Sequence, residues 1–314
     1  MNRNKKIILL VLGLAVSCLA AFGQGRILPI TETTTSALSL ATGGTHLGSQ
    51  TASLLYTNPT VALDLNRFEA DYSLTYMPTD GENILLHAPS VAVRTGKGAV
   101  LLGMRYMAMG TLNLVVDQQM QEITDKTIHM KSYTFDAGYA HPITRHLSAF
   151  ATVGYATEKT AANVHGFYGS LGANYSDSTY LGKKKLDYTA GLSVSNLGGY
   201  SYDDEQGRLS PRVAVGGSMR LATARSQYLH LYAEAAHFFK SGKADGCSEC
   251  VAGLGYTLFE NYTLLAGGHS GDGNPAVTAG FMARFNSIVI SIATRFGIQK
   301  DQNNSYMASV MLQL

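Results

Sequence analysis

Apolar and polar residues alternate along most of the chain after about residue 67. The stretch 186–197 shows the pattern clearly. Leu, Tyr, Ala, Leu and Val occupy its even positions from Leu186 to Val194, and polar or small residues stand between them. A period of two residues predicts a β-strand with one apolar face and one polar face. Such stretches recur to the C-terminus, so the fold must place many apolar strand faces together.

About fourteen alternating segments can be marked, an even number, as in closed bacterial outer-membrane barrels. The segment 84–94 is the weakest, because Pro89 interrupts it and a central strand tolerates proline poorly. The predicted strands are 68–76, 84–94, 99–109, 132–140, 147–158, 166–176, 185–197, 212–221, 227–238, 248–258, 262–268, 276–285, 287–297 and 305–314.

The connections between these segments alternate in length. If both chain ends are periplasmic, the longest connections, such as 110–131 and 198–211, face outward, and most tight turns, such as 259–261, face the periplasm. Long outer loops and short periplasmic turns are typical of outer-membrane barrels, whereas a soluble sandwich or propeller predicts no such asymmetry. The sequence therefore predicts an all-β transmembrane barrel over 67–314.

Composition agrees with this architecture. Charged residues make up 15% of the chain, Gly occurs 33 times, and Tyr outnumbers Phe while Trp is absent. Few charges, many glycines and many tyrosines suit a barrel with an interfacial aromatic girdle. The net charge of +2 gives no case for a nucleic-acid partner.

The N-terminus has the pattern of a signal peptide. A basic stretch at 2–6 precedes the apolar run Ile7–Val16, and Ala21-Phe22-Gly23 is a small-x-small cleavage site. We therefore expect residues 1–23 to be removed on export. A lipoprotein signal ending at Cys18 is the alternative.

Two cysteines, Cys247 and Cys250, follow the signal segment. In an exported protein they predict a local disulfide or two free thiols. A metal site would need two further ligands, and no partner motif lies nearby.

Small and apolar residues surround Gly43-Gly44 in the segment 24–66, and Asn58-Pro59 marks a turn. This pattern resembles the N-terminal motif of the PorV/PorQ family of Bacteroidetes outer-membrane proteins, relatives of the FadL long-chain fatty acid transporter. In that family a Gly-Gly stretch precedes an Asn-Pro-Ala triplet, although Thr60 replaces the alanine here. The resemblance implies that Ser36–Leu63 folds into the lumen of the barrel as a hatch.

The middle of the chain extends the resemblance. Ser193–Gly198, followed by Leu209-Ser210-Pro211, is similar to the family's mid-barrel "N-L-G … L-P" passage. The resemblance then covers nearly the whole mature chain. It implies an accessory barrel of type IX secretion in a Bacteroidetes-like outer membrane, with export machinery or exported cargo proteins as partners.

The alternative is a FadL-like transporter of a hydrophobic ligand. A lateral opening would need a kinked strand, for which Pro89 is the in-strand candidate. An apolar lumen pocket would favour the transporter, and a lumen filled by ion pairs would favour the interaction protein.

If the apolar faces contact outer-membrane lipid, the charged side chains of the strands point into the lumen. There they would form a network that holds the hatch, or they would line a selective path. A charge on the lipid face would cost roughly 2–4 kcal/mol for Arg or Lys at the midplane. The predicted lumen-facing residues are Glu69, Asp71, Arg105, Asp136, Asp187, Arg220, Glu234, Arg284 and Arg295.

Catalytic motifs are missing from the sequence. None of the nine histidines lies in His-Glu-x-x-His, and no Gly-x-Ser-x-Gly occurs. His230 and Glu234 share the polar face of one predicted strand, which leaves a lipid-modifying enzyme as a third reading. The sequence predicts no enzyme activity, no cofactor and no metal.

Overall fold

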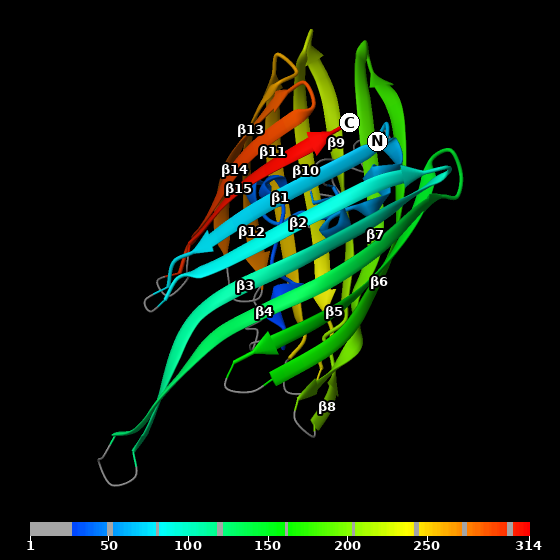
Figure 1. Ribbon diagram of the computed structural model, residues 1–314. Helices are drawn as coiled ribbons and strands as arrows, with labels where there is room; N and C mark the ends of the chain where they lie inside the picture. The colour runs from blue at the N-terminus through cyan, green and yellow to red at the C-terminus, as the bar shows by residue number, and fades with distance from the viewer. Residues whose placement is uncertain are drawn as a thin grey trace.

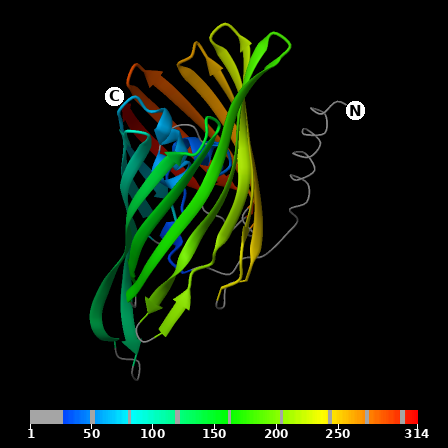
Figure 2. The same ribbon diagram turned by 90° about the vertical axis from the view of Figure 1, so that its right-hand side faces the viewer.

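The computed structural model describes residues 27–48, 53–79, 82–117, 122–160, 163–202, 205–241, 245–271, 275–299 and 304–314. The predicted signal peptide, its cleavage site and Cys18 lie outside the described residues. The chain forms a tall antiparallel β-barrel with a short N-terminal segment in its interior (Figures 1 and 2).

Fourteen long strands make the wall, and a four-residue strand, β8, pairs with the end of β7. All of the fourteen predicted strands are present. The bounds are β1 (Phe68–Met77), β2 (Ile84–Thr95), β3 (Gly98–Asp117), β4 (Glu122–Pro142), β5 (Leu147–Lys159), β6 (Asn163–Leu181), β7 (Lys184–Tyr202), β8 (Glu205–Arg208), β9 (Arg212–Ala224), β10 (Gln227–Phe238), β11 (Cys247–Leu258), β12 (Tyr262–Gly271), β13 (Ala276–Phe285), β14 (Ile288–Gly297) and β15 (Ser305–Gln313).

The barrel closes where its first and last strands meet. β1 pairs with β15 from Glu69↔Gln313 to Tyr76↔Tyr306, and Phe68 and Leu314 exchange backbone hydrogen bonds beyond that ladder. Each remaining long strand pairs with its neighbours in the chain, and β7 also pairs with both β8 and β9. In the described part of the chain, closure gives each of the fourteen long strands a hydrogen-bonded neighbour on both sides.

The longest predicted loop, 110–131, is largely sheet. β3 continues to Asp117 and β4 starts at Glu122, so this hairpin extends well beyond the neighbouring strands, as the cyan and green ribbons of Figure 1 show. The sequence analysis placed this region outside the strands, and the structure shows that strand pairing continues through most of it.

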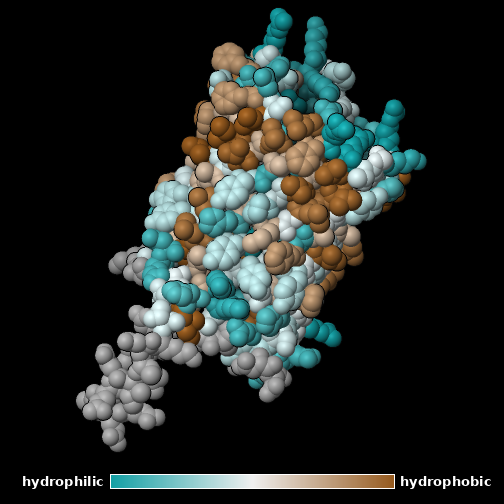
Figure 3. Space-filling model, viewed as in Figure 1, coloured by the Kyte–Doolittle hydropathy of each residue, from teal (hydrophilic) through white to brown (hydrophobic). Residues whose placement is uncertain are grey.

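The wall reverses the usual distribution of polarity. Large apolar side chains such as Leu102, Val153 and Ile292 are more than half exposed, whereas Ser73 and Thr134 are buried on the inner face. Figure 3 shows apolar side chains gathered over one part of the outer surface. This is the arrangement expected of a barrel whose outer face contacts lipid. In the described part of the chain, no helix has the length and apolar character to cross a membrane.

In the described residues, four short helical elements precede the barrel. They are η1 (Pro29–Thr31), α2 (Ala37–Ala41), η2 (Leu54–Tyr56) and η3 (Pro59–Asp64). α2 packs against β12–β15 and η3 packs against β2–β5, so the segment contacts the inner wall on both sides of β1 (Figure 2).

Two places in the wall depart from regular pairing. The β2–β3 ladder skips Ala88 and Pro89, because proline has no N–H to donate, yet the register is the same on both sides of the gap. The β7–β9 ladder ends at Ser195↔Arg212, and β7 pairs with β8 again only from Gly199. Asn196 has a left-handed φ of 57° at this break, which is a conformation that Asn tolerates better than most residues.

Candidate functional site

Glycine permits the close seating of the N-terminal segment. Gly43 and Gly44 have φ values of 86° and 102°, and a Cβ at Gly43 would collide with the carbonyl of Gly268 on β12. On the wall side, a Cβ at Gly253 or Gly267 would collide with Thr42. The Gly-Gly motif of the sequence therefore fits a glycine-lined part of β11 and β12.

Asn58 organises the second half of the segment. Its side-chain Oδ1 caps η3 by accepting from the backbone N–H of Thr60 (3.3 Å), and Pro59 begins that helix. The same oxygen accepts from Nδ2 of Asn174 on β6 (2.8 Å), while Asn58 Nδ2 donates to the carbonyl of Leu47 (3.2 Å). One buried amide thus connects the Asn-Pro turn to the wall and to the chain before it.

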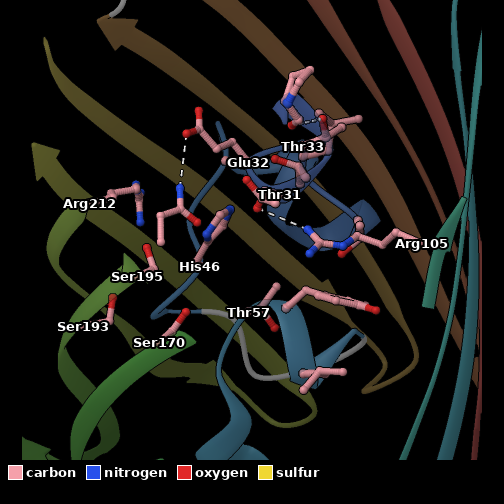
Figure 4. A pocket seen from close by; sticks show the side chains of 18 of the residues that line it. Thr31, Glu32, Thr33, His46, Thr57, Arg105, Ser170, Ser193, Ser195 and Arg212 are labelled. Carbon is pink, nitrogen blue, oxygen red and sulfur yellow. Dashed lines mark hydrogen bonds between the residues drawn. The ribbon is translucent and has the colours of Figure 1, made fainter. Parts of the chain in front are cut away.

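Arg105 on β3 anchors the start of the segment. Its Nη1 donates to the carbonyls of Ile30 (2.8 Å) and Thr31 (3.1 Å), the second of which is drawn in Figure 4. Its Nη2 forms a buried ion pair with Asp136 on β4 (3.3 Å) and donates to the hydroxyl of Tyr168 on β6 (2.6 Å).

Tyr56 of η2 completes this cluster. Its hydroxyl donates to Asp136 (3.1 Å), and the Arg105 guanidinium lies 4.6 Å from its ring centroid. The Tyr168 hydroxyl also donates to Asp136. Since every charged atom meets a partner, the cluster is a satisfied network.

A second cluster surrounds Arg212 at the start of β9. Arg212 pairs with Glu234 on β10 (2.8 Å) and with Glu249 on β11 (2.7 Å). The other oxygen of Glu234 accepts from the backbone N–H groups of His46 (2.7 Å) and Leu47 (2.8 Å). Burial lowers the pKa of His46, which lies beside these charges.

Two carboxylates on β1 have different partners. Asp71 accepts from the backbone N–H (3.1 Å) and hydroxyl of Ser53 in the segment and from Ser90 on β2 (2.7 Å). Glu69 accepts from Gln313 (2.9 Å), which in turn accepts from Arg284 (2.9 Å). Asp71 thus contacts the segment, whereas Glu69 joins Arg284 across the seam.

The remaining predicted lumen residues lie apart from these anchors. Asp187 pairs with Lys185 (2.8 Å) near the turn between β6 and β7, and the Arg220 guanidinium lies 3.8 Å from the ring centroid of Tyr228. Arg295 on β14 lines the lumen cavity described next. His230 and Glu234 do not bind each other. His230 contacts the Thr257 hydroxyl (2.9 Å), whereas Glu234 binds Arg212.

A cavity of about 430 Å³ lies between the segment and the inner wall. Ser170 of β6 and Ser193 and Ser195 of β7 face it from one side, and Thr57, Thr31 and Arg105 lie across from them (Figure 4). Eleven of its lining residues are Ser or Thr. Among the described residues, no group of three or more His, Cys, Asp or Glu is placed to hold a metal ion.

A second cavity, of about 380 Å³, lies at the break in the β7–β9 ladder. Leu197, Leu209, Pro211 and Phe239 line it. Asn196, one residue before Leu197, lines the first cavity and donates to Glu32 (3.2 Å). The break therefore lies between the lumen cavity and the outer face of the wall.

The structure disfavours one of the two alternatives predicted for Cys247 and Cys250, a local disulfide between them. Both residues lie on β11, three positions apart, so their side chains project from opposite faces of the strand. Three strand residues span about 10 Å, well beyond the Cα separation that a disulfide allows. Cys247 is buried on the inner face.

Sequence reasoning missed Arg212 and Glu249. Arg212 stands at the first position of its strand, and Glu249 lies between the two cysteines. Arg212 lies two positions from Ala214, and Glu249 lies two positions from Val251, so each charged residue shares the inner face of its strand with a residue that the alternation already placed there. This periodicity was the signal that could have identified them.

No family model and no curated protein sequence matches this chain. Among solved structures, it is similar to the toluene transporter TbuX of Ralstonia pickettii, with 13% identity and a TM-score of 0.60 over 88% of this chain and 98% of that one. It is also similar to the toluene transporter TodX of Pseudomonas putida, with 13% identity and a TM-score of 0.58 over 93% and 99%.

At this identity the likeness shows the fold alone, a closed antiparallel β-barrel similar to the barrels of these two transporters. The predicted all-β barrel of about fourteen strands is confirmed to that extent, and the outer-membrane location stays a prediction. Both neighbours are transporters by name. The narrower resemblance to PorV/PorQ stays a prediction.

Proposed function

We propose that this protein is a FadL-like conduit for small molecules across the outer membrane, in which residues 27–66 act as a hatch. The observation that carries the proposal is the cavity of about 430 Å³ between those residues and the wall. Its volume falls in the range of ordinary ligand pockets. Hydrophobic solutes are the class that the neighbours' names suggest.

The break between β7 and β9 offers a route out of the lumen. Asn196 faces the lumen cavity, and Leu197 is 42% exposed on the outer face. In our proposal a solute leaves through this gap, where the β7–β9 ladder is interrupted and the Leu209 N–H donates to the Gly198 carbonyl (3.1 Å) across the break. Pro89 is a weaker candidate, because the sheet keeps its register there.

Uptake into cells that carry the protein in their outer membrane tests the proposal. Ser170→Trp and Ser193→Trp place bulky rings in the cavity and should abolish protein-dependent uptake of small solutes. Leu192→Trp, at a residue 53% exposed on the outer face of the same strand, is the matched control. Equal uptake by all variants, or none above cells lacking the protein, would exclude a conduit.

An interaction protein is the second candidate, as the PorV/PorQ resemblance implies. The β3–β4 hairpin supports it, because this hairpin extends beyond the barrel where a partner has access (Figure 1). The ion pairs in the lumen also agree with this reading.

Replacing residues 112–127 with a short turn separates the two functions. If the hairpin docks secretion proteins or cargo, their co-purification from outer membranes is lost while solute uptake persists. If the protein is a conduit alone, the shortened form transports normally and no stoichiometric protein partner is found with either form.

A further inference from the structure

If the protein is the conduit proposed above, the side chains that line the lumen cavity indicate the chemical class of its ligand. Its lining combines eleven Ser and Thr residues with Asn196, Tyr56 and Tyr168. Hydroxyl and amide groups both donate and accept hydrogen bonds. Some of these groups already have partners in the protein, since Tyr56 and Tyr168 donate to Asp136 and Asn196 donates to Glu32. A hydrocarbon that filled the cavity would remove the remaining hydroxyls from water without replacing their hydrogen bonds, which is unfavourable.

Two buried hydroxyls in the lining lack partners. The side-chain oxygens of Thr35 and Thr75 make no hydrogen bond within the described residues, although the two residues are only 1% and 2% exposed. Buried polar atoms are nearly always hydrogen-bonded in proteins. Both oxygens are shielded from the cavity, so the hydroxyls that can meet a ligand are those of other lining residues, such as Ser170 and Ser193.

The hydroxyls also form a continuous patch on the wall. Thr152 of β5 lies opposite Ser170 of β6, and Gly172, further along the same face of β6, lies opposite Ser193 of β7. Figure 4 shows Ser170, Ser193 and Ser195 on one side of the cavity. Three adjacent strands therefore present side-chain hydroxyls to one volume.

The charges in the lining balance. It contains the three arginines Arg105, Arg212 and Arg295 and the three acids Glu32, Asp136 and Glu249. Arg105 and Arg212 are already bound to carboxylates. An anionic or cationic ligand would have to compete with these ion pairs, so the cavity favours a neutral one.

Apolar surface completes the lining. Phe150 and Phe238 are buried side chains that line the cavity from β5 and β10. Ring C–H groups of a sugar can pack on such surface while its hydroxyls reach Ser, Thr and Asn. We propose that the cavity binds a neutral, polyhydroxylated solute of the size of a mono- or disaccharide.

Isothermal titration of the purified mature protein with arabinose, glucose, maltose and toluene tests this proposal. Removing two hydroxyls with the double substitution Ser170→Ala and Ser193→Ala should weaken sugar binding about tenfold. The matched control is Ser291→Ala with Ser309→Ala, since these serines are paired on the inner faces of β14 and β15 outside the cavity. It should bind as the wild type does.

The possible outcomes distinguish the proposed substrate class from the proposed conduit function. Sugar binding that depends on Ser170 and Ser193 supports the substrate class. Binding or uptake of toluene without sugar overturns that class and leaves the conduit intact. If neither kind of solute binds or crosses the membrane, both the substrate class and the conduit are wrong.

Discussion

The carboxylate of Glu234 accepts a hydrogen bond of 2.7 Å from the backbone N–H of His46, which ties β10 to a residue that precedes the first strand of the barrel. The other carboxylate oxygen binds Arg212. Glu234 therefore links the N-terminal segment to the buried charges of the wall.

We expect Glu234→Gln to loosen the segment. The substitution keeps the shape of the side chain but leaves Arg212 one carboxylate short, and breaking a buried ion pair typically costs about 3–5 kcal/mol. Hydrogen exchange at the amides of His46 and Leu47, read by mass spectrometry, should accelerate. Asp245→Asn, which removes the exposed ion pair with Lys240 (3.2 Å), is the control. Unchanged exchange in Glu234→Gln would contradict the linking role.

Docking of the segment should weaken in acid. Burial lowers the pKa of His46 below its ordinary value of 6.5, Arg212 acts in the same direction, and Glu234 and Glu249 oppose it. The released segment then binds a proton more readily than the docked one. Docking is therefore strongest above pH 6.5 and is lost progressively below it, by up to about 1.4 kcal/mol per pH unit.

Channel recordings in planar bilayers between pH 7.5 and 5 measure this loss. Openings should become more frequent toward low pH in the wild type, and His46→Gln should flatten the dependence, because its side chain does not titrate. An identical pH profile for both proteins would show that other groups control the segment.

Gly43 and Gly44 form a natural pair of test and control. Both have positive φ, so Ala is strained at either position, but only at Gly43 does the new Cβ collide with the backbone of Gly268. Gly43→Ala should therefore destabilise the protein by about 1–3 kcal/mol more than Gly44→Ala. Urea denaturation in lipid bilayers measures the difference, and equal losses would mean that the close approach to β12 contributes little.

Asn58 and Asn174 should be energetically coupled. Their side chains share a buried hydrogen bond of 2.8 Å, and Asn58 also caps η3. Asn58→Ala should cost about 1–2 kcal/mol through the lost cap. A double-mutant cycle with Asn174→Ala should give a coupling energy of at least about 0.5 kcal/mol. Additive effects would show that the two amides stabilise the fold independently.

The strands were predictable because alternation is a local signal. The segment 276–285 was predicted at its observed bounds, and most others differ by a few residues at their ends. Strand ends were harder to place where pairing continues beyond the main barrel, as in β3, because the alternation fades there.

The candidate site was less predictable, because its contacts join residues distant in the chain. The inward alternation of Arg105 and Asp136 indicated that they face the lumen, but nothing local indicated that Tyr56 would reach them. The spacing of Cys247 and Cys250 left a local disulfide open, because the predicted strand starts at 248 and only the structure places both cysteines on β11.

The segment inside the barrel also constrains the order of assembly. Ala41 accepts a hydrogen bond from Thr278 (2.9 Å), and Gly43 lies against Gly268. These strand residues leave the ribosome long after the residues that they hold. Contacts between such distant parts of a chain form late and slowly. The last strands must therefore pair around an N-terminal segment that already lies inside the barrel. A chain in which β1 and β15 paired before that segment had entered would have to break this pairing again.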